Sequence, residues 1–76
     1  MFHPDHPKLI TLAETEGYRD IVDFLEDCAL DSLVPAICMA PGCDYTAELE
    51  PDQRAGFCEL CGRPSMQSSL IIAGLI

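Results

Sequence analysis

The stretch "CMAPGCDYTAELEPDQRAGFCELCG", residues 38–62, places four cysteines in two close pairs. Four residues separate the first pair, two separate the second, and fourteen lie between Cys43 and Cys58. Two close pairs flanking a hairpin-sized segment have the spacing of a structural zinc site. Each pair spans a tight turn that can point both sulfurs at one ion, and Gly42 and Gly62 supply the permissive backbone such turns need. The predicted ligands of one Zn²⁺ are Cys38, Cys43, Cys58 and Cys61.

Other readings of these cysteines stay open. Four thiolates leave no open coordination position, so a metal held by them is expected to be structural and not catalytic. Iron also accepts four thiolates, but we would then expect two C-x-x-C-G turns, and only the second pair has that form. A redox dithiol at Cys58 and Cys61 would need a following helix and a larger fold. The last alternative is that the cysteines are only small buried apolar residues.

Three further residues are candidate ligands by type. Cys28 lies on a predicted helical stripe, where a buried core thiol is expected, and a fifth or replacement ligand is the alternative. His3 and His6 lie close to Pro4 and Pro7, and we expect them to be exposed or to start a helix. No partner residues for an additional metal site at these histidines can be identified from the sequence.

Residues 1–33 are predicted to form a helical hairpin. Asp5 is expected to cap a first helix with Pro7 in its first turn, and Gly17 to end it. Asp20 is expected to cap a second helix. Apolar residues then recur with helical spacing. The residues expected to be buried are Leu9, Leu12 and Ala13 in the first helix, and Ile21, Phe24, Leu25 and Cys28 in the second.

Residues 34–64 are predicted to form short strands and turns. The segment "VPAIC" is expected to run extended into Cys38, because Pro35 disfavours helix at the residue before it. The alternating pattern of "DYTAELE" predicts a half-buried strand, and "EPDQ" predicts a turn, after which the chain returns to Cys58 along a second strand. The polar tip at Asp52 and Arg54 is either a solvated turn or a partner contact.

Residues 65–76 are ambiguous between strand and helix. The segment "SMQSS" is compatible with a third strand, after which Ser68 or Ser69 would cap a short helix in "LIIAGLI". Periodicity alone does not decide so short an apolar run. We expect this tail to join the core, and a docking tail for a partner is the alternative.

The sequence as a whole predicts one small α+β domain, residues 1–76. The helical hairpin of residues 1–33 is expected to pack on a C-terminal antiparallel zinc ribbon, residues 34–76, that ends in the short apolar element. A chain of 76 residues has a marginal core and often needs a staple such as a metal.

Charge and composition disfavour several classes of partner. The net charge is −9, with thirteen carboxylates against the four basic residues Lys8, Arg19, Arg54 and Arg63. Nucleic-acid and anionic-membrane binding depend on lysine and arginine, so both are disfavoured, whereas a basic protein partner is favoured. The longest strongly apolar run has seven residues, and the N-terminus lacks the pattern of a secretory signal. A cytoplasmic protein in a reducing compartment is therefore expected, where clustered cysteines more often bind metal.

Residues 36–76 also carry a pattern of short motifs. These are C-x4-C-D-Y-T from Cys38, E-P-D-Q from Glu50, G-x-C-x-x-C-G from Gly56, and an apolar end from Leu70. The pattern resembles that of a family of small uncharacterised zinc-ribbon-like proteins of bacteria and their phages. The resemblance covers about half of the chain closely. It implies a zinc-ribbon module and brings no known activity, substrate or partner.

The sequence offers no catalytic constellation, because no nucleophile–base pair and no glycine-rich phosphate loop is present. We therefore expect a non-catalytic, zinc-binding protein that acts as a protein-interaction or regulatory adaptor module. A nucleic-acid-binding accessory protein is the alternative, and it requires the four basic residues to cluster on one face. A thiol–disulfide redox protein that uses Cys58 and Cys61 is the minor alternative. The oligomeric state is not predicted.

Overall fold

Two helices form the N-terminal half of the chain in the computed structural model, which describes residues 2–3 and 5–75. Helix α1 spans Pro7–Thr15 and helix α2 spans Ile21–Ala29. Gly17 turns the chain after α1 with a φ of 86°, a left-handed value that glycine adopts without strain. Asp20 caps α2 by accepting a hydrogen bond from the backbone N–H of Val22 at 2.8 Å. Both predictions are confirmed.

The prediction that Asp5 caps α1 is wrong. The cap is His6, whose Nδ1 accepts a hydrogen bond from the backbone N–H of Lys8 at 3.1 Å. Pro7 occupies the first helical position, as predicted. Because a proline pushes the residue before it out of the helical region, His6 is the residue held in the extended cap conformation, with φ −61° and ψ 129°.

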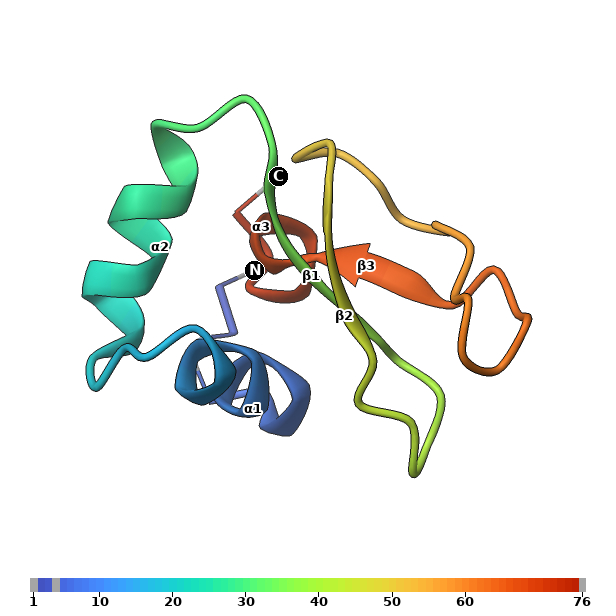
Figure 1. The fold of residues 1–76 in the computed structure, drawn as a ribbon. Coiled ribbons are helices and arrows are strands. Elements are labelled where there is room, and N and C mark those ends of the chain that lie inside the picture. Colours follow the sequence, from blue (N-terminus) through green and yellow to red (C-terminus); the bar gives the residue numbers. More distant parts are fainter. Residues whose placement is uncertain (1, 4, 76) are drawn as a thin grey trace.

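Three short strands form an antiparallel sheet in the C-terminal half. Strand β1 spans Val34–Cys38, β2 spans Thr46–Leu49 and β3 spans Met66–Ser68. Their order is β2-β1-β3, so β1 is the central strand (Figure 1). Ala36 pairs with Ala47 on one side and with Ser68 on the other. Three consecutive residues of β1 (Ala36, Ile37 and Cys38) are fully buried, because both faces of this strand are covered.

The predicted return strand before Cys58 is not formed. Strand β2 pairs instead with β1, which precedes it in the chain, and residues 50–57 run through turns and bends. Gly56 alone pairs in this segment, by two hydrogen bonds of 2.9 Å with Met66. The packing at Gly56 is tight, since a Cβ there would lie 2.6 Å from Leu49 Cδ1 and 3.2 Å from Met66 Cβ. The turn that begins at Pro51 therefore leads directly into close packing rather than into a paired strand.

The C-terminal segment is helical. Helix α3 spans Ser69–Ile72, and Ser68 caps it by accepting a hydrogen bond from Ile71 N at 3.2 Å. The Ser68 hydroxyl also donates to the backbone carbonyl of Pro51. Leu70, Ile72 and Ala73 are buried, so the tail is part of the core, as predicted. Ile76, the last residue of this predicted element, lies outside the described residues.

Two clusters of buried side chains lie on either side of β1. The first, the helical core, contains Leu9, Leu12, Ala13, Phe24, Leu25, Cys28, Val34, Ile37, Leu70, Ile72 and Ala73. The second, the cysteine core, contains Ala36, Cys38, Cys58 and Met66. The chain is thus a small α+β protein. Helices α1 and α2 lie beside α3 (Figure 1), and all three contribute to the helical core. Within the described residues, no helix is both long enough and apolar enough to cross a membrane.

Candidate metal centre

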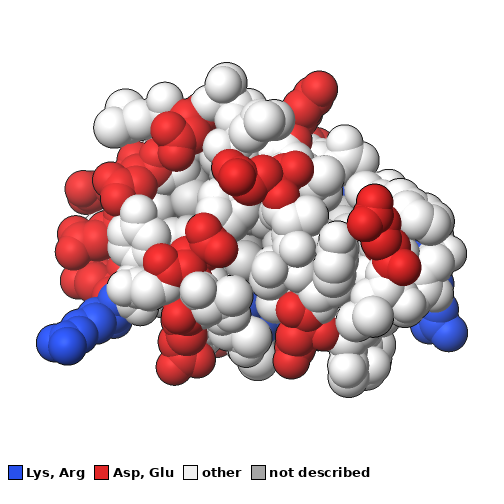
Figure 2. All heavy atoms as spheres, viewed as in Figure 1, with Lys and Arg blue, Asp and Glu red and all other residues white. Residues whose placement is uncertain are grey.

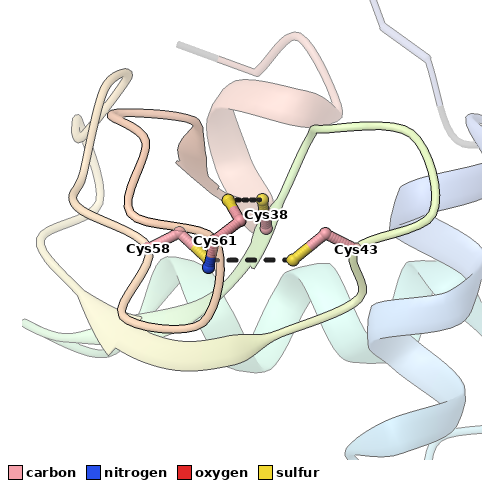
Figure 3. Close-up of side chains that lie close together, drawn as sticks. All are labelled: Cys38, Cys43, Cys58 and Cys61. Atoms are coloured by element: carbon pink, nitrogen blue, oxygen red, sulfur yellow. Dashed lines mark hydrogen bonds between the residues drawn. The ribbon is translucent and has the colours of Figure 1, made fainter.

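The structure brings the four predicted ligands together. Cys38 ends β1, Cys43 lies in the loop that follows, and Cys58 and Cys61 lie in the turn that precedes β3. Their Sγ atoms all lie within 4.8 Å of one another (Figure 3). The close contacts, both 3.7 Å, join Cys38 to Cys61 and Cys43 to Cys58, so each contact links one cysteine pair to the other.

The two Sγ–Sγ distances of 3.7 Å fit a single tetrahedral ion. A Zn–S bond of about 2.3 Å at tetrahedral angles places neighbouring sulfurs about 3.8 Å apart. Both 3.7 Å contacts match that spacing. A disulfide needs about 2.05 Å between its sulfurs, so neither contact is a bond. The donor set therefore suits one thiophilic ion such as zinc, bound by both cysteine pairs.

Tight turns hold each pair in place. Gly42 and Gly62 have φ values of 80° and 72°, so the left-handed conformations predicted to need glycine are present. The first turn closes with a hydrogen bond from Cys43 N to Ala40 O at 3.1 Å. The second closes with one from Gly62 N to Cys58 O at 2.7 Å, and Cys61 N also donates to Cys58 Sγ at 3.5 Å. A backbone N–H directed at a cysteine sulfur, as that of Cys61 is, is the kind of contact that supports a metal ligand from outside the coordination shell.

The four thiols differ in burial and acidity. Cys38 and Cys58 are buried, Cys43 is partly buried and Cys61 is the most exposed. Burial alone would raise the pKa of Cys38, but the hydroxyl of Ser65, 3.0 Å from its sulfur, the Ala40 backbone and the neighbouring thiols lower it to about 6. The Tyr45 backbone lowers the pKa of Cys43, but burial and the three neighbouring thiols outweigh it and raise that pKa to about 11.

Lys8 contacts the first cysteine turn from α1. Its Nζ donates to the carbonyls of Ala40 at 3.0 Å and Cys43 at 2.5 Å, and it pairs with the Asp44 carboxylate at 2.8 Å. The Lys8 side chain is only 15% exposed. It therefore ties the helical half to the loop that carries half of the site. Sequence reasoning missed this residue because 32 to 36 positions separate the partners and no periodicity links them.

The remaining candidate ligands lie outside the cluster. Cys28 is 2% exposed within the helical core, where its sulfur accepts a hydrogen bond from the Ser69 hydroxyl at 3.2 Å, and burial raises its pKa. The prediction of a core thiol is confirmed. His6 starts α1 as its cap, also as expected, and His3 is exposed.

The polar tip, residues 52–54, is hydrogen-bonded to the C-terminal segment. The carbonyl of Gln53 accepts a hydrogen bond from Ser68 N at 3.1 Å, so the turn is tied to the junction of β3 and α3. Asp52 and Arg54 are exposed. A partner contact at this tip stays a prediction.

No family model, curated protein or solved structure matches this chain. Membership of the zinc-ribbon-like family therefore stays a prediction from the motif pattern. The clustering of the four cysteines in that pattern rests on the structure itself.

Proposed function

We propose that the chain is a non-catalytic protein in which Cys38, Cys43, Cys58 and Cys61 bind one structural Zn²⁺. The observation that carries the proposal is the cluster of four Sγ atoms within 4.8 Å of one another. Four thiolates occupy every position of a tetrahedral zinc ion and leave none for water or substrate. Iron is the second choice, because the thiolate set suits it but the first pair lacks the C-x-x-C-G form.

We further propose that the zinc-bound chain acts as a protein-interaction or regulatory adaptor module. Support comes from the number of large apolar side chains left in solvent on a chain with a net charge of −9. These side chains are Phe2, Ile10, Val22, Leu30, Leu33, Phe57, Leu60 and Leu75. Three of them, Phe2, Val22 and Leu75, line one groove. Exposed apolar groups that gather on a surface in this way mark contact sites.

The nucleic-acid alternative has less support. It required the four basic residues to cluster, and Figure 2 shows basic side chains at opposite ends of the molecule with acidic ones between them. The Lys8 ammonium is also occupied by two carbonyls and a carboxylate. Phosphate neutralisation requires several free cations on one surface.

The redox alternative is also weaker. The close sulfur contacts of Cys58 and Cys61 are with the other pair and not with each other. Residues 58–62 form a turn, whereas the first cysteine of a dithiol oxidoreductase lies at the start of a helix.

Elemental analysis of the purified protein tests the metal assignment. We expect one zinc per chain, loss of that zinc in Cys58→Ser, and full retention in the matched control Cys28→Ser, whose sulfur lies outside the cluster. Equal zinc content in all three proteins, or none in the unaltered protein, contradicts the assignment. Incubation with cell extract at physiological salt tests the interaction role, and recovery of no protein partner by the zinc-loaded chain counts against it.

A further inference from the structure

An apolar groove lies between α2 and the two ends of the chain. It is lined by Phe2, Val22, Leu25, Glu26, Ala29 and Leu75. Its volume is about 270 Å³, just under the range of about 300–1,000 Å³ typical of small-molecule sites. The groove has the size for a few inserted side chains and is too small and open for a cofactor.

Helix α2 carries more apolar surface than the helical core uses. Phe24, Leu25 and Cys28 are buried, but Val22 on the groove side is 51% exposed. Phe2 and Leu75, on the opposite wall of the groove, are each 47% exposed. Among the residues that the structure describes, nothing covers these side chains. Burying these side chains against a partner would contribute roughly 25 cal/mol of favourable free energy for each Å² of apolar surface removed from water.

The charge around the groove selects the kind of occupant. Residues 20–31 contain five carboxylates and no lysine or arginine: Asp20, Asp23, Glu26, Asp27 and Asp31. Figure 2 shows acidic side chains gathered over the side of the molecule where α2 lies. Glu26 itself lines the groove. A second copy of this chain would bring two such acidic surfaces together, and like charges at an interface oppose binding.

We propose that this groove binds a basic amphipathic helix of a partner protein. Apolar side chains spaced at i, i+3 and i+4 on that helix fill the groove, and its flanking lysines and arginines face the carboxylates of α2. The inference rests on the proposed interaction role and names its surface and the chemistry of its partner. Charge governs the rate and selectivity of this contact, and the apolar groove supplies the free energy.

The test uses a synthetic helical peptide of leucine and lysine, about 15 residues long so that it can form a helix. Leucines occupy one helical face and lysines the rest, and a peptide of the same composition in scrambled order is the control. Binding to the zinc-loaded protein is followed by amide chemical shifts in ¹⁵N NMR. We expect the largest shifts at Val22, Leu25, Ala29 and Leu75, with weaker binding at higher salt and weaker binding of the scrambled peptide.

Two variants and a matched control locate the contact. Val22→Ser removes apolar surface from the groove and should weaken binding about tenfold. Glu26→Lys reverses a charge on its wall and should weaken binding about fivefold and flatten the salt dependence. Glu48→Lys is the matched control, because it makes the same charge change at an exposed position of β2 outside the groove lining, and it should leave the peptide shifts at Val22, Leu25, Ala29 and Leu75 in place.

The outcomes separate this inference from the metal assignment. Elemental analysis before the titration measures the zinc content of the protein. Purified protein without zinc would count against the metal site alone and would say nothing about the groove. Loaded protein that binds neither peptide, binds both equally, or shifts mainly at Phe57 and Leu60 overturns the proposed groove. Dimerisation of the free protein that Val22→Ser abolishes also overturns it, because the occupant would then be a second copy.

Discussion

Lys8 connects the two halves of the molecule through one side chain. Lys8→Met keeps the length of the side chain but leaves the carbonyls of Ala40 and Cys43 without their donor. We expect the zinc-loaded variant to lose about 1–3 kcal/mol of its free energy of unfolding and to give up zinc to a chelator faster. Urea unfolding and the rate of zinc transfer to a chromogenic chelator measure the two effects.

Lys8→Arg is the matched control, because it keeps the positive charge and can donate to several acceptors. Its stability and transfer rate should lie between those of the unaltered protein and Lys8→Met. If Lys8→Met changes neither quantity, the three contacts of Lys8 do not support the site.

Tyr18 provides a pH-dependent contact away from the cysteines. Its hydroxyl donates to the Asp27 carboxylate at 2.6 Å, and this hydrogen bond, with burial and nearby acidic charge, raises the pKa of Tyr18 to about 12. A raised folded-state pKa stabilises the protein below the unfolded value of about 10. That contribution is lost as the pH rises from about 10 to about 12.

Absorbance titration of the phenol measures this pKa. In a Tyr45→Phe background Tyr18 is the only tyrosine, so the phenolate absorbance reports its titration alone. Asp27→Ala should return the midpoint of that titration to about 10. An unchanged midpoint in Asp27→Ala would show that Asp27 does not hold the Tyr18 proton.

The roles of some single residues could be predicted from the sequence, and those of others could not. The clustering of the four cysteines could be predicted, because the spacing of each pair encodes a turn that is local in the chain. His6 replaced Asp5 as the cap because the effect of Pro7 on its neighbour outweighs the usual preference for aspartate. Lys8 could not be predicted, since only the folded chain brings α1 to the first cysteine turn.

At the scale of elements, Ser68 joins β3, α3 and the turn at Pro51. Ser68→Ala removes both the cap of α3 and the donor to the Pro51 carbonyl, at a fully buried position. We expect a cost of about 1–3 kcal/mol in the free energy of unfolding. Thermal or urea unfolding of the zinc-loaded protein measures it.

Ser69→Ala is the control at the next position, which is equally buried. Ser69 donates only to the Cys28 thiol, a weak acceptor, so its loss should cost less than about 1 kcal/mol. Equal costs at the two positions would mean that the cap and the Pro51 contact contribute nothing of their own.

Local signals predicted α1, α2, β1 and β2, whereas α3 was left open between helix and strand and the strand predicted to return beside β2 is not formed. The apolar spacing of α2 and the cap at Asp20 lie within one short segment, so they could be deduced from sequence. The strand that pairs with β2 is set by the three-dimensional arrangement of the chain, and in the structure this strand is β1. Residues 50–57 form a single bridge, from Gly56 to Met66, and no paired strand. The close packing of Gly56 on Leu49 and Met66 depends on the folded chain and carries no local signal.

The whole molecule has two cores that share β1, and the metal is expected to hold only one of them directly. The cysteine core contains two of the four proposed ligands, Cys38 and Cys58. Structural zinc contributes about 10–16 kcal/mol of apparent binding free energy, much of it folding energy. Removal of the metal by a strong chelator should therefore collapse the C-terminal half, with loss of amide dispersion in NMR for residues 38–66. Native-like dispersion after complete metal removal would contradict this expectation.

The central claim is that four cysteine sulfurs bind one zinc ion. X-ray absorption spectroscopy at the zinc edge of the purified protein measures the number, type and distance of the ligands directly. We predict four sulfur ligands at about 2.3 Å and no nitrogen or oxygen ligand. A first shell that contains nitrogen or oxygen, or fewer than four sulfurs, would contradict the claim.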